Sequence, residues 1–185
     1  MVTTGTVEAQ LAQPSPGVTD AVLLERAWRA LSTVMDPEVP VVSIVELGIV
    51  RDVRLDGPTL VIEVTPTYSG CPATETIIRD IDDALDARGV SNPRIETTLA
   101  PAWSTDRIAP EAKRRLQAFG IAPPHVVRPR VDVAGISPLR RATQVMCPRC
   151  GSFRTKLVSQ FGSTACKAHY RCENCLEPFD YFKAF

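Results

Sequence analysis

Apolar residues recur at helical spacing in two stretches of the first hundred residues. A helix is expected from Thr19, a favourable N-cap, to about Val34, before Asp36-Pro37. A second helix is expected from Pro72 to Ala87, with Gly89 at its end. Each carries one apolar face, made in the first by Val22, Leu23, Ala27, Leu31 and Val34 and in the second by Ile77, Ile78, Ile81 and Leu85.

Three segments between and after these helices show the pattern of β-strands. Gly48–Leu55 alternates apolar with charged residues, and Leu60–Val64 is rich in β-branched side chains. Asp56-Gly57 between them is a turn signal, so the two strands should pair as a hairpin. A third strand is expected at Arg94–Leu99. The order α-β-β-α-β over residues 18–100 predicts an α+β fold, a small sandwich of helices on a sheet.

Composition divides the rest of the chain into three parts. Residues 1–17 are small and polar, and we expect a disordered tail. Residues 101–142 contain six prolines and a cluster of arginines. We expect them to form a connector that packs in part, with one short helix at Glu111–Phe119. Residues 143–185 hold five of the six cysteines and are expected to form a separate module.

Four of these cysteines form two Cys-x-x-Cys knuckles separated by 21 residues. A two-residue spacer lets both sulfurs of a knuckle reach one ion, and the intervening chain can return as a hairpin. The pattern predicts a C-terminal zinc ribbon with a closed, structural site, although a four-sulfur tetrahedron also suits iron. The ligands would be Cys147, Cys150, Cys172 and Cys175. Most of the aromatic tail should be core of the last strand, and an exposed remainder would be a partner contact. The tail consists of Phe179, Tyr181, Phe182 and Phe185.

The remaining C-terminal cysteine, Cys166, would be a fifth ligand where four suffice. The simpler interpretation is a core or near-surface thiol, and the alternative is an extra metal or cluster ligand that joins Cys71 across the domain interface. His169 could replace a cysteine in a mixed site, but the four cysteines are better spaced. His125 lies between Pro124 and Val126 and is most simply a loop histidine.

Charge is distributed unevenly along the chain. Residues 1–106 hold 16 acidic and 7 basic side chains, and the rest hold 5 and 14. The halves could attract each other or a partner. Nucleic-acid binding by Arg128, Arg130, Arg140, Arg141 and Arg154 is the less favoured interpretation, because no dense basic stripe with interleaved aromatics is present. No apolar run is long enough for a membrane span and no export signal is seen, so a reducing cytoplasm is expected.

The isolated Cys71 precedes the second predicted helix directly. The positive end of a helix dipole and unpaired amide groups favour thiolate, so its pKa should fall below the free value of about 8.5. Gly70 would let the backbone turn sharply and approach a ligand. The alternative is that Cys71 is a small buried packing residue.

Three motifs in this half, Met35–Glu38, Ser43–Val50 and Thr65–Glu75, carry a resemblance. Together they are similar to the small α/β iron–sulfur assembly factors, the SufT-like family, over roughly residues 20–100. The resemblance implies that Cys71 is the reactive or cluster-contacting thiol, and that it transiently holds iron or an iron–sulfur cluster. It also implies supporting residues around that thiol, namely Asp36, Glu38, Gly70 and Thr74.

Further motifs extend the resemblance to nearly the whole chain. With them the sequence resembles the PaaD family, the D subunits of bacterial phenylacetyl-CoA epoxidase systems. This implies a role in phenylacetate catabolism with the other subunits as partners, but not the epoxidation itself. The chain has no Glu-x-x-His pair for a di-iron site and no Gly-x-Gly-x-x-Gly fingerprint. The motifs are Pro101–Asp106, Gly120–Pro124, Cys147–Ser152, Phe161–Ala168 and Glu177–Lys183.

Our leading hypothesis is an accessory factor that matures or stabilises an iron or iron–sulfur centre of the oxygenase through Cys71. The alternative is a permanent structural subunit without metal transfer. A thiol enzyme would need a general base for Cys71, and neither histidine lies in a recognisable motif. A single cysteine cannot complete four-sulfur ligation, so a cluster would need Cys166, the client or a second copy in a homodimer.

Overall fold

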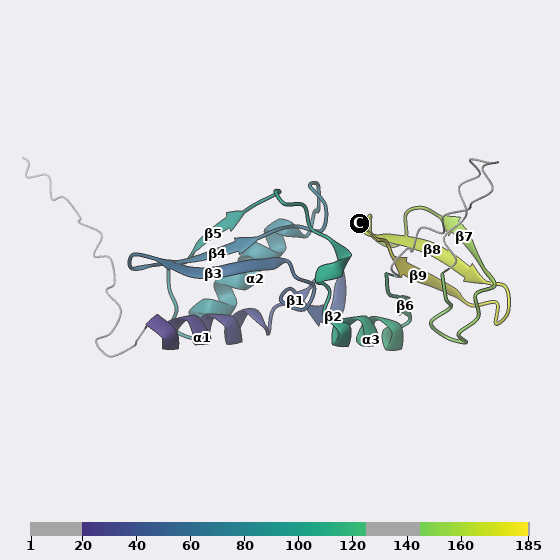
Figure 1. Ribbon diagram of the computed structural model, residues 1–185, viewed down its shortest axis with the longest axis horizontal. Helices are drawn as coiled ribbons and strands as arrows, with labels where there is room; N and C mark the ends of the chain where they lie inside the picture. Colours follow the sequence, from purple (N-terminus) through teal and green to yellow (C-terminus); the bar gives the residue numbers. More distant parts are fainter. Residues whose placement is uncertain (1–19, 125–144, 185) are drawn as a thin grey trace, which may run out of the picture.

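The N-terminal domain is a three-stranded sheet covered by two helices, and a small all-β module lies at the other end of the molecule (Figure 1). This computed structural model describes residues 20–124 and 145–184. The predictions for residues 1–17, for His125, for Phe185 and for most of the arginine cluster lie outside these ranges. Within them, no helix is both long and apolar enough to cross a membrane.

Both predicted helices are present, with shifted ends. Helix α1 spans Asp20–Leu31 and ends before the predicted Val34. Helix α2 spans Thr74–Asp86, so Pro72 lies in a turn and not in the first helical turn. Val22, a member of the predicted apolar face, is 44% exposed. Side chains one residue apart on a helix point about 100° apart, and the core-facing stripe of α1 runs through Ala27, Ala30 and Leu31.

The central sheet confirms the predicted strand order. Strand β3 (Val50–Asp56) pairs antiparallel with β4 (Thr59–Val64). Strand β5 (Arg94–Thr97) lies parallel to β4, so β4, α2 and β5 form a β-α-β crossover. Apolar side chains of the strands and of both helices share one core, in which the largest fully buried members include Leu31, Ile62, Ile81 and Leu85.

A short hairpin that the sequence did not indicate lies beside this sheet. Strands β1 (Met35–Asp36) and β2 (Val39–Ser43) pair antiparallel around a turn at Pro37 and Glu38. The Oδ1 atom of Asp36 accepts the backbone N–H groups of Glu38 and Val39, each at 2.8 Å. Asp36 therefore fixes the acidic turn instead of ending α1.

The N-terminal core continues past the predicted boundary at residue 100. The segment that follows contains a 3₁₀ turn, η1 (Thr105–Arg107), and helix α3 (Pro110–Phe119). The buried indole of Trp103 donates to the carbonyl of Leu47 at 2.9 Å. The carboxylate of Glu46 pairs with Arg115 of α3. Much of the predicted connector is therefore part of the N-terminal domain, through Trp103, Ile108, Ala112 and Leu116.

The C-terminal module, here called the ribbon, consists of residues 145–184 and strand β6, and its four-stranded sheet has the order β6-β9-β8-β7. Strands β7 (Thr155–Ser159), β8 (Lys167–Cys172) and β9 (Pro178–Phe182) are antiparallel. Strand β6 (Ile121–Ala122) comes from the chain just after α3 and lies parallel to β9. The ribbon has its own small core, made of Ala122, Val145, Cys147, Ala168, Tyr170, Cys172, Phe179 and Tyr181.

Two ribbon residues belong to the N-terminal core instead. Phe182 is 1% exposed, and its ring centroid lies 6.0 Å from that of Trp103. Cys166 is 3% exposed and packs in the same core. The prediction that Phe182 forms part of the ribbon core is therefore corrected, because this side chain joins the ribbon to the N-terminal domain.

Candidate functional site

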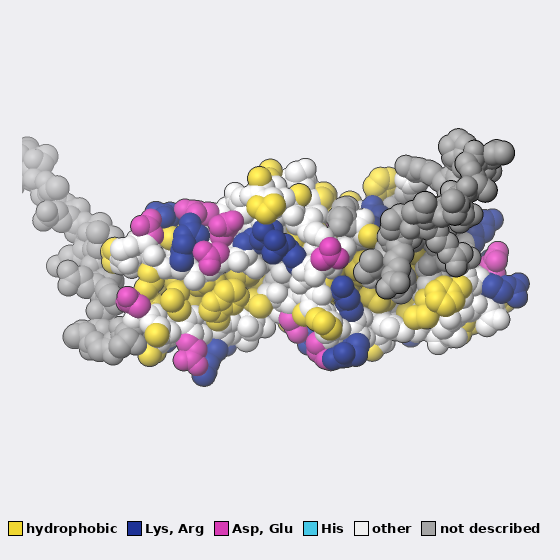
Figure 2. Space-filling view, in the orientation of Figure 1, with side chains coloured by type: hydrophobic (Ala, Val, Ile, Leu, Met, Phe, Trp, Pro, Cys, Tyr) yellow, Lys and Arg dark blue, Asp and Glu magenta, His cyan; other side chains and the backbone are white. Residues whose placement is uncertain are grey.

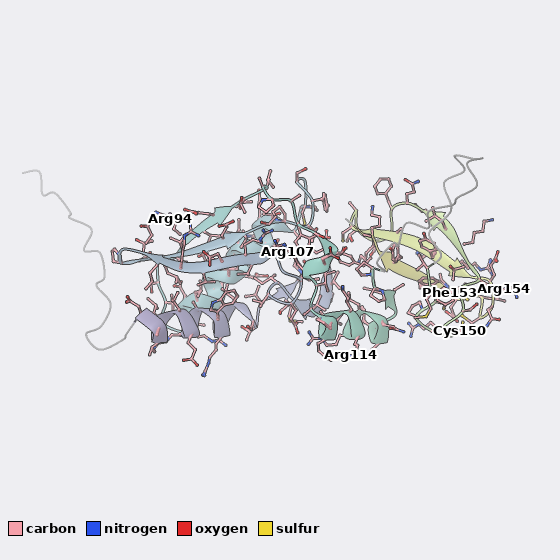
Figure 3. The ribbon with its side chains drawn as sticks, viewed as in Figure 1. Arg94, Arg107, Arg114, Cys150, Phe153 and Arg154 are labelled. Atoms are coloured by element: carbon pink, nitrogen blue, oxygen red, sulfur yellow. The ribbon has the colours of Figure 1, made fainter. Side chains whose placement is uncertain are left out.

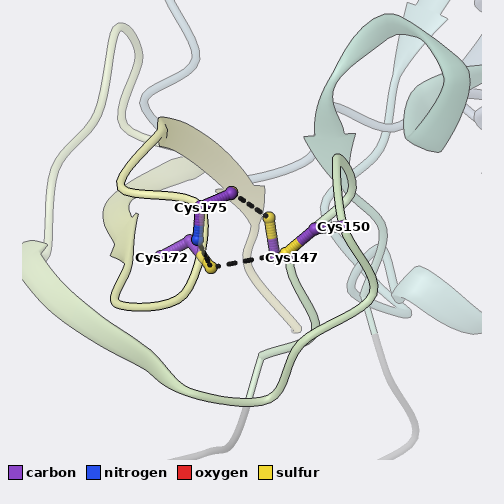
Figure 4. A group of neighbouring side chains, drawn as sticks. All are labelled: Cys147, Cys150, Cys172 and Cys175. Atoms are coloured by element: carbon purple, nitrogen blue, oxygen red, sulfur yellow. Dashed lines mark hydrogen bonds between the residues drawn. The ribbon is translucent and has the colours of Figure 1, made fainter.

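The sulfur atoms of the two knuckles converge on one point, as the spacing predicts (Figure 4). The four atoms lie within 4.8 Å of one another. Cys147 Sγ is 3.7 Å from Cys175 Sγ, and Cys150 Sγ is 3.6 Å from Cys172 Sγ. Zinc–sulfur bonds of about 2.3 Å in a tetrahedron place the sulfurs about 3.8 Å apart. The four cysteines therefore fit a tetrahedral metal ion.

Neighbouring N–H groups stabilise these sulfurs as thiolates. The backbone amides of Asn174 and Cys175 donate to Cys172 Sγ at 3.3 and 3.5 Å, and the Asn174 side chain donates to Cys150 Sγ at 3.7 Å. A hydrogen bond from the Ser152 backbone is the main cause that lowers the pKa of Cys150 to about 6. A backbone hydrogen bond that involves Glu177 acts to lower the pKa of Cys175, but burial and the other three cysteines raise it to about 12. Thiolate is the form that binds metal, so Cys150 supplies it more readily than Cys175 does.

Cys71 lies in a turn just ahead of α2. Its amide donates to the carbonyl of Tyr68 at 3.1 Å, and its own carbonyl accepts from the amide and the hydroxyl of Thr74 at 3.3 and 2.9 Å. Thr74 therefore holds the Cys71 backbone. A Cβ added at Gly70 would meet only the ring of Tyr68, at 3.8 Å, so the fold itself does not require glycine there.

The predicted lowering of the Cys71 pKa is wrong. Burial of the half-exposed thiol raises its pKa, and the negative charges of Glu38 and Asp36 raise it further. The amide of Ala73 does donate to the thiol and acts in the opposite direction, as expected at the start of a helix. The pKa of Cys71 is raised because burial and the two carboxylates together have a larger effect than the amide of Ala73.

The carboxylates of Glu38 and Asp36, in the acidic turn, act on Cys71 electrostatically. Asp36 is buried, and burial raises its pKa although its carboxylate accepts two backbone N–H groups. Glu38 is less buried and turns its carboxylate toward the ribbon.

Cys166 meets this turn from the ribbon side. Its Sγ lies 3.4 Å from Glu38 Oε2 and 3.0 Å from Thr164 Oγ1. Burial is the main cause that raises its pKa to about 11. The neighbouring Lys167, also buried, donates from Nζ to the Glu38 carbonyl at 3.0 Å. Cys166 is thus a core thiol, as its simpler interpretation held, but it lies against a charged turn.

The phenol of Tyr68 is influenced electrostatically by both thiols. Burial raises its pKa, and the charges of Cys71, Glu38 and Cys166 all add to this rise. One phenol therefore lies within electrostatic reach of both thiols and the carboxylate. We call Cys71, Cys166, Glu38 and Tyr68 the junction site. Among the described residues, the four-cysteine centre is the one metal-sized cluster of Cys, His, Asp or Glu ligand atoms, so the junction site is more widely spaced.

His169, the one histidine in the described part of the chain, pairs with a ribbon carboxylate and is not placed as a base for Cys71. The Nδ1 atom of His169 lies 3.1 Å from Asp180 Oδ1 within the ribbon, and His125 is outside the described residues. Sequence reasoning missed Tyr68 and Lys167 as neighbours of the thiols. Tyr68 stands three residues before Cys71 in the same motif, which is the signal that could have indicated it.

Comparisons with known proteins match the two parts of the chain separately. Residues 24–91 match the family model "Iron-sulfur cluster assembly protein", and residues 133–183 match "PaaD zinc beta ribbon domain". A solved structure of the domain of unknown function DUF59 from Bacillus anthracis is 32% identical, with a TM-score of 0.49, and covers 52% of this chain and 93% of its own.

Two curated proteins are similar at the level of sequence. An Fe-S protein maturation auxiliary factor of Porphyromonas gingivalis (strain ATCC BAA-308 / W83) is 36% identical over 91 residues, 48% of this chain and 85% of its own length. A protein of Escherichia coli (strain K12), named provisionally as the D subunit of a 1,2-phenylacetyl-CoA epoxidase, is 49% identical over 157 residues, 84% of this chain and 90% of its own. By this similarity and its two-part architecture, the chain belongs to the family of phenylacetyl-CoA epoxidase D subunits.

Proposed function

We propose that this protein is an accessory subunit of a phenylacetyl-CoA epoxidase system in phenylacetate catabolism. It matures or stabilises an iron or iron–sulfur centre of the oxygenase complex through Cys71. The observation that carries the proposal is the position of Cys71, a half-buried thiol flanked by Asp36 and Glu38 in a domain that matches the iron–sulfur assembly family. The names of the two curated relatives point to the same pair of roles.

The high pKa of Cys71 is compatible with carrying a cargo. A thiol that is protonated when empty resists oxidation and alkylation, because thiolate is the reactive form. It loses its proton only when a metal centre competes for the sulfur. Burial, together with the charges of Glu38 and Asp36, keeps the empty thiol in this protected state.

In the same proposal the ribbon holds a structural zinc ion and contacts the client subunits. Exposed apolar side chains gather on it, with Phe153 56% and Phe161 66% exposed (Figure 2). Phe153 and Arg154 lie on the side of the ribbon away from the N-terminal sheet (Figure 3). Protein interfaces favour aromatic side chains with arginine beside them. We place the protein in the cytoplasm, where all six free thiols stay reduced.

The test is to co-produce the oxygenase subunits with no accessory chain, with the wild-type chain and with the Cys71→Ser variant. Iron, acid-labile sulfide and epoxidase activity are then measured on the purified complex. We expect metal content and activity to fall in the absence of the chain and equally with Cys71→Ser. Ser69→Ala, an exposed neighbour in the same loop, is the matched control and should behave as wild type.

A fully metallated, active complex in the presence of Cys71→Ser would contradict the proposal. If the variant also stayed bound to the complex at fixed stoichiometry, a permanent structural subunit would be the better description. Weak, transient association of the wild-type chain with an active complex would instead favour maturation.

A further inference from the structure

We propose that strand β7 of the ribbon is a docking edge for an extended segment of a client subunit, in which acidic and apolar side chains alternate. The segment adds to the four-stranded ribbon sheet as a further strand. This rests on the proposed function and deepens it, because it gives the client contact of the ribbon a place, a geometry and a chemical class.

Strand β7 forms one edge of the ribbon sheet, and within the described chain it pairs only with β8 (Figure 1). The Arg154 carbonyl accepts the amide of Glu173 on the β8 side at 2.8 Å. Backbone groups along an antiparallel edge point alternately toward and away from the neighbouring strand, so those of Lys156 face β8 and those of Leu157 face outward. No described residue bonds to these outward groups of Leu157. They are therefore an open donor and acceptor for another strand.

The two faces of β7 differ in chemistry. Side chains directly opposite each other in an antiparallel pair lie on the same face. Leu157 is opposite Tyr170 of the ribbon core, yet it is 40% exposed at the open edge. Lys156 is opposite Arg171 on the other face, and both are exposed. A strand added here extends the core with apolar side chains beside Leu157 and meets basic side chains on its other face.

The basic side chains of this face have no carboxylate partner in the described part of the chain. Arg154, Lys156 and Arg171 form no ion pair there. Like charges directly opposite each other, as Lys156 and Arg171 are, destabilise a strand pair. On the N-terminal sheet, by contrast, Arg54 of β3 pairs with Glu96 of β5. Acidic side chains of an incoming strand supply the missing counterpart, so the partner segment is acidic.

Exposed apolar side chains gather along the same segment. Four of the ten large hydrophobic side chains that are exposed in the described chain lie within residues 153–161, so they form one surface and are not scattered. Phe153 precedes β7 and is 56% exposed, Val158 within it is 60% exposed, and Phe161 after it is 66% exposed. A concentrated apolar surface of this kind marks an interaction site.

A second copy of this chain fits the edge less well than an acidic partner does. Residues 153–161 contain two basic side chains and no acidic one, so pairing two β7 strands brings the positive charges of both copies together. A bulge between Leu157 and Ser159 also ends the regular edge early, which is a device that limits self-association. An acidic segment meets no such repulsion.

The experiment measures, by fluorescence anisotropy, the binding of short labelled peptides to the full chain loaded with zinc. One peptide alternates glutamate with valine, a second holds the same residues in two blocks, and a third has lysine in place of glutamate. We expect the alternating acidic peptide to bind at least about tenfold more tightly than the other two. Hydrogen exchange should show the outward amide of Leu157 protected when this peptide is bound.

Leu157→Pro tests the backbone contact, because proline removes the outward N–H but no bond to β8. It should weaken binding of the acidic peptide at least about tenfold, whereas Leu157→Ala keeps the N–H and should weaken it less. Arg154→Glu combined with Lys156→Glu should weaken the acidic peptide and strengthen the lysine peptide. Arg79→Glu, exposed on α2, is the control and should bind as wild type does. Zinc content and far-ultraviolet dichroism show that each variant is folded, and the charge exchange keeps the test valid if proline is not tolerated.

Equal binding of the three peptides would overturn the inference, because apolar attraction alone would then explain it. Undiminished binding to folded Leu157→Pro, or a wild-type chain that binds no peptide, would do the same. Self-association of the free chain that Leu157→Pro abolishes would assign the edge to a second copy, and salt-sensitive binding of single-stranded DNA that displaces the peptide would assign it to nucleic acid. Cys71→Ser should bind the peptide as wild type does, so the metal content of the oxygenase complex decides the proposed function separately.

Discussion

The thiol of Cys71 shows how a local argument at the scale of one residue can be reversed by its tertiary surroundings. The amide of Ala73 favours thiolate, and the sequence places this group correctly near the helix start. Burial and the charges of Glu38 and Asp36 act against it and raise the pKa. These neighbours come from a hairpin more than thirty residues away, so no local pattern around Cys71 could reveal the direction of the shift.

Alkylation of Cys71 should report this raised pKa directly. Only thiolate reacts with iodoacetamide, and its fraction rises about tenfold per pH unit below the pKa. Since the pKa of Cys71 is raised above that of a free cysteine, the rate should rise between pH 7 and pH 9 without a plateau. Glu38→Gln removes a negative charge, lowers the pKa and should increase the rate at pH 7 severalfold. Mass spectrometry of the zinc-loaded protein measures the rate at this one cysteine.

Glu25→Gln, on the exposed face of α1, serves as the control and should leave the rate unchanged. A plateau already at pH 7 would mean a low pKa and an activated thiolate, contrary to the geometry described above.

Gly48 offers a second prediction at the scale of one residue. Its φ is 70°, and an added Cβ would lie 2.5 Å from the Cβ of Arg107. Gly57 has a similar φ of 59° but open space around it. Gly57→Ala should therefore cost roughly 1 kcal/mol of unfolding free energy from the backbone alone, and Gly48→Ala at least twice as much because of the added clash. Equal losses in urea denaturation would show that residues 47–49 and 106–108 do not pack as described.

Among the helices and strands, the sequence predicted those that are marked by regularly spaced apolar residues or by turn residues. Helices α1, α2 and α3 and strands β3, β4 and β5 all follow apolar spacing or turn residues. Strands β1 and β6 have two residues each, too few to show any alternation, and β2 contains Pro40, which is unusual in a strand. These three elements form through tertiary packing and were missed for that reason.

The candidate sites likewise differ in how far local sequence spacing could predict them. The four-cysteine centre could be predicted because its ligands stand at fixed local spacing. Cys71 and its acidic neighbours followed from a family resemblance and not from any spacing. The contact between Glu38 and Cys166 joins positions 128 residues apart, and depends on how the ribbon packs on the N-terminal domain. A single sequence carries no direct signal of such a contact.

Removing the metal should affect the ribbon far more than the helices. The ribbon core is small, so a bound metal ion should supply much of its folding energy, as it does in zinc fingers. We expect a strong chelator, or Cys172→Ser, to abolish amide protection in β7, β8 and β9 while α1 and α2 stay protected in hydrogen-exchange measurements. A metal-free ribbon that kept its protection would show that its apolar core suffices.

For the whole molecule, the important fact is that the two domains share a core. Phe182 of β9 fills space beside Trp103 in the N-terminal domain and is fully buried there. Replacing a buried phenylalanine by alanine removes its apolar burial and leaves a cavity, which together cost about 3–5 kcal/mol of stability. Phe182→Ala should therefore destabilise both the ribbon and the N-terminal domain, in one transition rather than two.

The exposed Phe161 gives the matched control, since Phe161→Ala removes the same side chain from the surface and should change stability by less than about 0.5 kcal/mol. The measurement is thermal unfolding followed at wavelengths that report helix and strand separately. Loss of the ribbon signal alone in Phe182→Ala would show that the two domains unfold independently.

The pairing of β6 with β9 has a topological consequence. Ala122 and Val145 lie in the same small ribbon core, so the chain leaves and re-enters that core at neighbouring points. Strand pairing and the buried Phe182 hold the ribbon on the N-terminal domain through non-covalent contacts. A polypeptide that ends at residue 124 and a second one that begins at residue 145 should therefore associate through these contacts.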